Sequence, residues 1–381
     1  MKLLWLTEHY YPHGGGMAQS CERIVSHLRA LGVAIDLVHL TRRSRRQPNK
    51  ETELGFDLRW PLTDAPAHGI NLLWNWLEAQ LQGVNSATQT YQGIVVFGAH
   101  YAPLAGLTFA KWLEIPLFSF ARGNDFDIGV FDIKKRAFLQ ELYEYSNLVF
   151  CVSRDKQQKI PKLFSKAEAV WVSNGIELNQ WTIENYHRRQ RESLREKHID
   201  PNKKVLGLFG HIKEKKGGIF LLESILNSGL AAYLQLLVVG DMEDETLAWV
   251  EENKSEVDVV HIPFVERSEL IPYYLLCHSV VIPSFYDGTP NVLLEAGMLK
   301  VPVLAANVAG MKDLLAEERA GVLFEPGDFH QLRYALEHLV HGDYKEWLVC
   351  ADRFQQMIVE RHSAEREATQ YQEYFQQHLK P

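Results

Sequence analysis

The sequence has 381 residues, of which 46% are hydrophobic and 23% charged, and its formal net charge is −8 at pH 7. A chain of this length is longer than a typical domain with one hydrophobic core, so two domains are expected. The negative net charge excludes a general nucleic-acid-binding protein. The four cysteines lie far apart without C-x-x-C spacing, which excludes a disulfide framework or zinc site and indicates reduced thiols.

The first elements in chain order form a strand, a glycine-rich loop, a helix and a second strand. The strand at residues 3–7 leads through HYYPHGGG to an amphipathic helix from about 18 to 31 and a strand at 34–40. This order predicts a βαβ unit. Glycine lets backbone N–H groups approach a phosphate at a helix N-terminus, so Gly15 and Gly16 are candidate ligand-binding residues. The alternative is an ordinary turn.

A dense basic cluster follows, formed by Arg42, Arg43, Arg45 and Arg46. It is either a solvated loop or a contact with anionic lipid or a phosphorylated acceptor. Residues 50–90 carry little pattern apart from an apolar, helix-like segment at 72–81. No stretch of the sequence approaches the roughly 18 uncharged apolar residues of a membrane span.

The strand and helix pattern resumes at residue 94. It predicts strands at 94–97, 116–120, 148–152 and 169–172, with helices at 104–112 and 133–145. His100 follows one strand, and Arg122 and Asp125 follow the next. If the sheet is parallel, these strand ends meet at one edge, where α/β proteins bind ligands. These three residues are therefore site candidates, with a capping or core histidine as the alternative for His100.

Residues 178–202 are rich in Arg, Glu and Asn and indicate a linker and a helix. The pattern beyond them predicts strands at 205–209, 236–239, 259–264, 280–282, 301–304 and 321–324, a helix at 331–341 and a terminal helix at 364–379. These elements predict a second doubly wound α/β domain.

The stretch 280–300, VVIPSFYDGTPNVLLEAGMLK, combines a short strand, a turn and a helix. Pro290 stands at the start of the helix, Asp287 lies in the turn, and Glu295 lies two turns into the helix. The helix N-terminus at a strand end favours an anionic ligand, which Lys216 would also hold. The two carboxylates, Asp287 and Glu295, could bind hydroxyl groups on either side of this anion. A diphosphate flanked by two hydroxyl-bearing groups is a sugar nucleotide, so the residues predict a sugar nucleotide as the ligand.

Three motifs carry a resemblance to a known family. PSFYDGTPNVLLEAG resembles the acidic-x7-Glu signature P-S-x-x-E-G-x-P-x-x-x-x-E-A of the retaining GT4 glycosyltransferases, VSNGIE resembles their I-x-N-G-V-D turn, and GHIKEKKG resembles their G-R-L-x-x-x-K-G loop. The resemblance covers nearly the whole chain. It implies the GT-B fold, α/β, with two doubly wound Rossmann-like domains facing across a cleft. The expected domains are 1–173, joined by a C-terminal helix at 362–381, and 174–361.

The resemblance also implies residue roles. Glu295 is expected to bind the ribose, Asp287 the donor sugar, and Lys216 the donor diphosphate. The full set of expected donor-binding residues is Gly15, Gly16, His211, Lys216, Gly288, Thr289, Asn291 and Glu295. The expected acceptor-side residues are His100, Arg122 and Asp125, and the expected catalytic residues are Asp287, Lys216, His100 and Arg122.

Two positions depart from the family pattern. His211 replaces the arginine of the diphosphate loop, and Arg122 stands where many relatives carry histidine. Arginine cannot act as a base at neutral pH, so Arg122 is expected to act electrostatically or to bind the acceptor. Asp125 and Asp127 also spell D-x-D, the metal motif of another glycosyltransferase fold, but such tripeptides are common by chance. We expect no metal site.

The resemblance implies a retaining, metal-independent glycosyltransferase. It would move a hexosyl group from a nucleotide-diphosphate sugar, its co-substrate, to a hydroxyl of a glycan, glycolipid or small molecule, with no cofactor. The alternatives are a non-catalytic sugar-nucleotide-binding protein, suggested by Arg122 and His211, and a sugar-nucleotide epimerase. The expected location is the cytoplasm, either free or in peripheral contact with a membrane through the arginine cluster.

Overall fold

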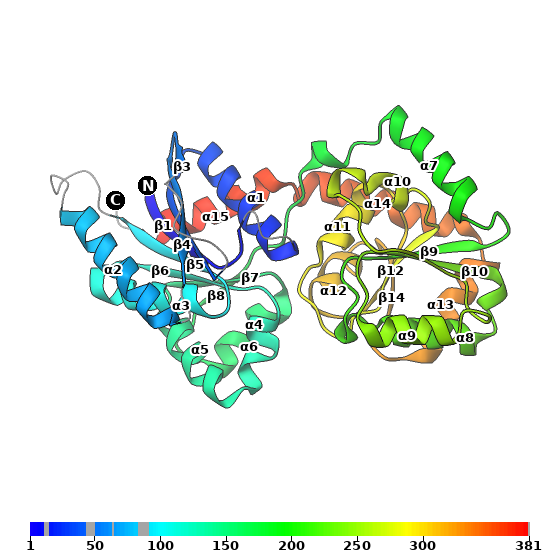
Figure 1. The fold of residues 1–381 in the computed structure, drawn as a ribbon, viewed down its shortest axis with the longest axis horizontal. Helices are drawn as coiled ribbons and strands as arrows, with labels where there is room; N and C mark the ends of the chain where they lie inside the picture. Colours follow the sequence, from blue (N-terminus) through cyan, green and yellow to red (C-terminus); the bar gives the residue numbers. More distant parts are fainter. Residues whose placement is uncertain (11–14, 43–49, 63–64, 83–90, 380–381) are drawn as a thin grey trace. The chain divides into compact units, whose positions relative to one another are not determined.

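The computed structural model describes residues 1–10, 15–42, 50–62, 65–82 and 91–379. The chain folds into two compact α/β units (Figure 1). The first unit comprises Met1–Asn174 and Ala364–Pro381, and the second comprises Gly175–Ser363.

The first unit is built on an eight-stranded sheet with the order β3-β4-β2-β1-β5-β6-β7-β8. All neighbouring strands are parallel except β3 and β4. The strands are β1 (Lys2–Thr7), β2 (Ala34–Thr41), β3 (Lys50–Thr52), β4 (Gly55–Pro61), β5 (Gly93–Phe97), β6 (Leu117–Ala121), β7 (Leu148–Cys151) and β8 (Ala169–Trp171). The central strands β5, β6 and β7 are buried along their whole length because helices cover both faces of the sheet.

Helices of the first unit follow most of its strands. They are α1 (Gly16–Ala30), α2 (Pro66–Gln82), α3 (Tyr101–Leu113), α4 (Asn124–Asp127), the 3-10 helix η1 (Gly129–Phe131), α5 (Ile133–Tyr145), α6 (Arg154–Leu163) and α15 (Ala364–His378). Strands β3 and β4 fall in the stretch 50–90 for which the sequence predicted only a helix. They pair at the sheet edge, where side chains are only partly buried and the apolar signal is weak.

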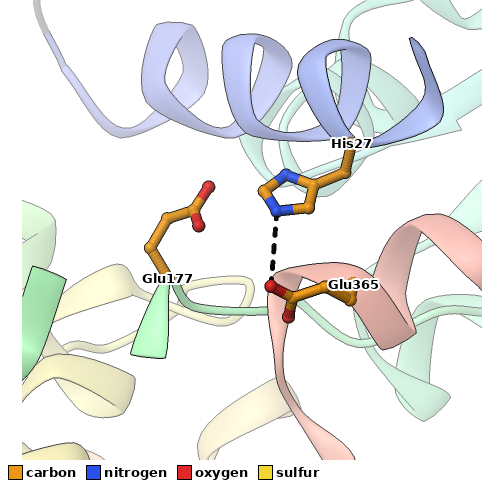
Figure 2. A group of neighbouring side chains, drawn as sticks. All are labelled: His27, Glu177 and Glu365. Atoms are coloured by element: carbon orange, nitrogen blue, oxygen red, sulfur yellow. Dashed lines mark ion pairs between the residues drawn. The ribbon is translucent and has the colours of Figure 1, made fainter. Parts of the chain in front are cut away.

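The C-terminal helix α15 packs against the first unit. Its Phe375 ring meets the Phe118 ring edge-on, with centroids 4.9 Å apart. Arg23 of α1 pairs with the buried Glu367 at 2.8 Å, Nε to Oε2. Nearer solvent, His27 of α1 lies 3.7 Å from Glu365, Nε2 to Oε1 (Figure 2). Aromatic packing therefore attaches the last helix of the chain to β6, and a buried ion pair attaches it to α1.

The second unit is built on a six-stranded, wholly parallel sheet with the order β11-β10-β9-β12-β13-β14. The strands are β9 (Lys204–Phe209), β10 (Leu234–Val239), β11 (Val259–Ile262), β12 (Ser279–Ile282), β13 (Val303–Ala306) and β14 (Val322–Phe324). Each corresponds to a predicted strand, since a doubly covered parallel strand produces a continuous apolar run.

Helices surround this sheet on both faces (Figure 1). They are α7 (Asn185–His198), α8 (Gly218–Ser228), α9 (Asp244–Glu252), α10 (Ile271–Tyr274), α11 (Asn291–Met298), α12 (Ala309–Leu315), α13 (Phe329–His341) and α14 (Tyr344–Arg361), with 3-10 helices η2 (Leu178–Trp181), η3 (Glu214–Lys216), η4 (Ala231–Tyr233) and η5 (Arg267–Glu269). The sequence did not predict α14, which packs its apolar side against α11.

Both sheets contain a switch point at which successive strands turn to opposite sides. In the first unit it lies between β1 and β5, and in the second between β9 and β12. In such sheets the loops at the carboxyl ends of the two strands leave a crevice that binds ligands. Among the described residues, no helix has the length and apolar composition needed to cross a lipid bilayer.

Candidate functional site

The switch point of the second unit brings together Lys216 and Asp287. Lys216 ends η3, in the loop after β9, and its Nζ pairs with Asp287 in the loop after β12. Two hydrogen bonds from backbone amides support this arrangement: Phe285 donates to the carbonyl of Lys215 at 2.9 Å, and Gly288 donates to the side-chain Oδ1 of Asp287 at 2.9 Å. Both predicted catalytic residues of this unit therefore lie in one place.

The two loops meet so closely that one position admits only glycine. Gly217 has φ of 68°, a conformation that side-chain-bearing residues rarely adopt. A Cβ atom there would lie 2.3 Å from the carbonyl oxygen of Pro283. The glycine of the KKG segment thus lets Lys216 approach the Asp287 turn.

Asp287 is largely buried, and opposing influences set its pKa. Burial raises the pKa, but Lys216, Lys215, the hydrogen bond from Lys216 and the amide of Gly288 lower it by more. The pKa therefore lies below the usual value for aspartate, and the carboxylate is ionised beside the Lys216 ammonium at neutral pH.

This lowered pKa predicts a defined pH dependence of stability. Because the folded-state pKa lies below the unfolded one, ionised Asp287 stabilises the fold above the unfolded pKa of about 4. That contribution disappears as the pH falls through the folded-state value. The difference in Tm between the wild type and Asp287→Asn should therefore stay constant from near neutral pH down to about pH 5 and shrink at lower pH. A difference that instead shrinks toward alkaline pH would contradict the pairing.

Glu295 lies in a separate polar network within the same unit. Its carboxylate is buried, and Oε2 accepts a hydrogen bond of 2.7 Å from the hydroxyl of Tyr274. Oε1 lies 3.7 Å from Nη2 of Arg267. Burial first, and the neighbouring Glu295 second, raise the pKa of Tyr274 well above its usual value, so the phenol remains a donor. The Tyr274 ring stacks on Phe209 of β9, with centroids 3.9 Å apart and an interplanar angle of 5°.

The turn between Asp287 and α11 supplies the remaining predicted residues. The amide of Gly310 donates to the carbonyl of Gly288 at 3.2 Å, and a Cβ at Gly310 would lie 2.0 Å from Oγ1 of Thr289. Thr289 is buried, and Asn291 begins α11. Gly310, the second residue of α12, therefore binds the Gly288–Thr289 part of the turn and keeps it close to the start of that helix.

Ser284 was not among the predicted site residues. It is fully buried, and its Oγ has no hydrogen-bond partner among the described residues. A buried hydroxyl without a partner is costly, so a ligand group is a natural partner for it. The signal in the sequence was its place in the P-S-x-x segment directly before Asp287.

His211 lies at the start of the loop after β9, and its side chain is exposed. Within the part of the chain that the structure describes, its ring makes no hydrogen bond or ion pair with Lys216, Asp287 or Glu295. Two glycines let the loops after β9 and β10 approach each other: Gly210 has φ of 95°, and a Cβ at Gly240 would lie 2.3 Å from the carbonyl oxygen of Gly210. A role for His211 toward the diphosphate stays a prediction.

In the first unit, Glu8 organises the loop that carries His100. One carboxylate oxygen of Glu8, Oε1, accepts from the backbone amides of His100 at 3.2 Å, Tyr101, and Ala102 at 2.7 Å. His100 is the N-cap residue of α3, but its side chain makes no capping bond and is exposed. The sequence missed Glu8 because no local pattern relates it to a helix 92 residues later.

Arg122 is buried at the carboxyl end of β6. Its Nη2 donates to Oδ1 of Asn174 at 2.7 Å, and its guanidinium carbon lies 5.3 Å from the centre of the Phe97 ring. Its Nη1 has no hydrogen-bond partner among the described residues. Asp125 closes the loop by accepting from the amides of Arg122, at 2.8 Å, and Gly123.

The second aspartate of the D-x-D tripeptide also has a partner. Asp127 pairs with Nζ of Lys156 at 2.8 Å, and Lys156 is fully buried. Burial raises the pKa of Asp127 and Lys156 opposes that rise. The two acids of the tripeptide therefore serve separate local contacts.

The other predicted residues of the first unit are only partly described. Gly15 precedes α1 with φ of 104°, and Gly16 is the first helical residue. Arg42 donates through Nη2 to the hydroxyl of Tyr101, with its guanidinium carbon 5.2 Å from that ring. Arg43, Arg45 and Arg46 lie outside the described residues.

Comparisons with known proteins agree with this geometry. Residues 203–342 match the family Glycosyl transferases group 1. Over 186 residues the chain is 29% identical to the capsular polysaccharide biosynthesis glycosyltransferase CapM of Staphylococcus aureus, a match that covers 45% of this chain and 44% of CapM. It thus spans less than half the length of that relative.

Solved structures extend the similarity to the whole chain. Sucrose-phosphate synthase from Thermosynechococcus elongatus superposes with a TM-score of 0.81 at 17% identity, covering 99% of this chain and 98% of the other. Anabaena HepE in complex with UDP-glucose superposes with a TM-score of 0.76 at 16% identity, covering 99% and 100%. Residues 203–342 thus resemble the family Glycosyl transferases group 1, and the solved structures show that the whole chain has the GT-B fold.

Proposed function

We propose that the protein is a retaining glycosyltransferase that moves a hexosyl group from a nucleotide-diphosphate sugar to a hydroxyl acceptor. The observation that carries this proposal is the Lys216–Asp287 pair at the switch point of the second unit. It combines a cation suited to a diphosphate with a carboxylate suited to sugar hydroxyls.

The donor would lie along the loops after β9 and β12. Lys216 would bind the diphosphate, Asp287 and the Gly288–Asn291 turn the sugar, and Glu295 the ribose hydroxyls. The HepE structure contains UDP-glucose, which supports a uridine diphosphate sugar as the donor class. A buried carboxylate that already accepts from Tyr274 retains lone pairs for hydroxyl donors.

Transfer would break the bond between the anomeric carbon and the diphosphate oxygen through an oxocarbenium-like transition state. Negative charge then gathers on the departing diphosphate, and a preorganised ammonium group stabilises it. The Asp287 carboxylate holds Lys216 in position before the donor arrives, so little reorganisation is needed when this charge develops.

On the acceptor side we propose His100 and Arg122 as the residues that meet the acceptor. Because an arginine side chain does not serve as a base at neutral pH, Arg122 would act electrostatically. Asp125 would act by holding the loop, since its carboxylate already accepts two backbone amides. The name of CapM supports a glycan or glycolipid acceptor.

The experiment that tests this function is a thermal-shift screen of UDP-, GDP- and ADP-sugars, followed by transfer assays with the donor that stabilises most. We expect a uridine diphosphate hexose to raise the Tm. In transfer, we expect a product whose anomeric configuration matches the donor, as determined by NMR. If the protein binds a donor tightly but neither transfers the sugar nor slowly hydrolyses the donor, that result would contradict an enzyme and favour a sugar-nucleotide sensor. An inverted product would contradict retention.

We also expect transfer to continue in the presence of a chelator. Asp125 accepts backbone amides, Asp127 pairs with Lys156, and Lys216 supplies the positive charge that a metal would otherwise bring. Initial rates with and without EDTA should agree. Complete loss of activity in EDTA that manganese or magnesium restores would show that a metal takes part.

A further inference from the structure

The start of helix α5 carries two large apolar side chains in open solvent. Phe131 is 85% exposed and Ile133 is 91% exposed, and Ile128 beside them is 46% exposed. An exposed hydrophobic residue is ordinary when it stands alone. Here two of the most exposed large apolar side chains of the described chain are separated by a single residue, Asp132.

Three cations follow directly. Lys134, Lys135 and Arg136 are all exposed, and no ion pair of their side chains is found among the described residues. The acid next to them is engaged: Oδ1 of Asp132 accepts the backbone amides of Lys134 at 3.0 Å and Lys135 at 3.2 Å. Three cations and one carboxylate leave residues 128–136 with a net side-chain charge of +2.

The order of charges along α5 opposes helix stability. The N-terminus of a helix carries a partial positive charge, so acidic residues there and basic residues at the C-terminus are stabilising. The N-cap residue Asp132 is acidic and caps α5, but the first turn itself holds cations and no acid, and the last turn holds no base. The three cations occupy the end that disfavours them, and an apolar pair is exposed at the same place. Stability of the fold explains neither feature.

We propose that residues 128–136 form a membrane-docking tip for an anionic phospholipid bilayer. Phe131 and Ile133 enter the boundary between headgroups and acyl chains, while Lys134, Lys135 and Arg136 contact lipid phosphates. Apolar side chains beside exposed cations are the combination that binds such surfaces. The segment extends from the end of α4 through the first turn of α5 in the first unit (Figure 1), and it begins three residues after Asp125.

A bilayer fits this surface better than a protein partner. A stable protein interface buries on the order of 800 Å² on each side. The exposed apolar surface here is confined to one short stretch, whereas a bilayer needs only a few inserted side chains and a cluster of cations. This proposal does not depend on the proposed transfer reaction, because lipid binding can be measured without donor or acceptor.

The test is flotation of the full chain with vesicles of phosphatidylcholine alone and of phosphatidylcholine with phosphatidylglycerol in equal parts. Binding is expected only with the anionic vesicles, and it should weaken as salt is added. The double variant Phe131→Ser/Ile133→Ser should weaken partitioning about tenfold or more. The triple variant Lys134→Gln/Lys135→Gln/Arg136→Gln should weaken it by about fivefold for each charge removed.

Matched variants in the second unit serve as controls. Tyr334→Ser removes a side chain that is 72% exposed, and Arg188→Gln/Arg189→Gln/Lys197→Gln removes three exposed cations from α7. Both should bind anionic vesicles like the wild type. None of the variants should have a lower Tm than the wild type, since the substituted side chains are exposed.

Three results would overturn the proposal. One is no binding of the wild type to anionic vesicles. Another is binding that the double and triple variants leave unchanged. The third is a concentration-dependent dimer, seen by analytical ultracentrifugation without lipid, that Phe131→Ser/Ile133→Ser abolishes, because the surface would then belong to a second copy of the chain.

Discussion

Replacing Lys216 with methionine is expected to lower kcat by about 10²–10³-fold, the effect of removing a preorganised charge that stabilises a developing anion. Methionine keeps the length and the apolar stem of the side chain but loses the ammonium group. The binding of free UDP should weaken less than kcat falls, because the charge on the departing diphosphate is greatest in the transition state. Steady-state kinetics together with calorimetry on UDP measure both quantities.

A second variant separates this role from a structural one. In Lys216→Met the Asp287 carboxylate remains largely buried without its ammonium partner, and that alone could disturb the site. The double variant Lys216→Met/Asp287→Asn removes the unpaired charge. If Lys216 acts on the diphosphate, the double variant stays as slow as the single one. Recovery of kcat in the double variant would contradict the proposed role.

Lys213→Met provides a matched control for this series. Lys213 lies in the same loop, is exposed, and makes no ion pair among the described residues. Its replacement removes the same charge from the same loop and should leave kcat within about a factor of two, as for ordinary surface substitutions. An equal loss of activity in Lys213→Met would mean that the net charge of the loop matters rather than the position of Lys216.

Much of the fold was predictable because local patterns reflect it directly. The strands β9, β10, β12 and β13 of the second unit are almost wholly buried, so each appears as an apolar run bounded by turn residues. The Asp287 turn was predictable for a similar reason, since a strand end, a glycine and a proline at a helix start lie within one short stretch. The apolar runs and the turn pattern each lie within one short stretch of sequence, so they can be recognised without knowing which distant residues they contact.

What could not be predicted depends on contacts between distant segments. The sheet order places β9 beside β12, and only that neighbourhood brings Lys216 to Asp287, 71 residues later. Glu8 and Tyr274 were missed for the same reason, because each acts on a residue that no local pattern connects to it. The edge strands β3 and β4 were missed because partial burial leaves no clear apolar alternation.

The second large effect is expected at Glu295. Replacing Glu295 with alanine should weaken the binding of free UDP by about 10- to 150-fold, since a hydrogen bond to a charged group contributes about 1.5–3 kcal/mol. Asp287→Asn should leave the affinity for free UDP nearly unchanged, because Asp287 is assigned to the sugar. Calorimetry with UDP compares the two variants directly, and equal losses would contradict this division of roles.

Tyr274→Phe tests whether the carboxylate must be held in place. Phenylalanine keeps the stack on Phe209 but removes the hydroxyl that donates to Oε2 of Glu295. The affinity for UDP should fall by about tenfold, less than in Glu295→Ala, because the carboxylate remains but one of its partners is lost. Tyr273→Phe is the matched control, since it removes a neighbouring hydroxyl that does not contact Glu295, and it should bind UDP like the wild type.

The nucleotide itself identifies what Glu295 binds. If its carboxylate accepts from the ribose, 2′-deoxy-UDP should bind the wild type more weakly than UDP does, because a buried carboxylate then loses a donor. The same change in ligand should matter far less to Glu295→Ala, which has no carboxylate left to satisfy. In a double-mutant cycle, the combined loss should therefore be much smaller than the sum of the two separate losses. Strictly additive losses would place the ribose elsewhere and leave Glu295 as a purely structural partner of Tyr274 and Arg267.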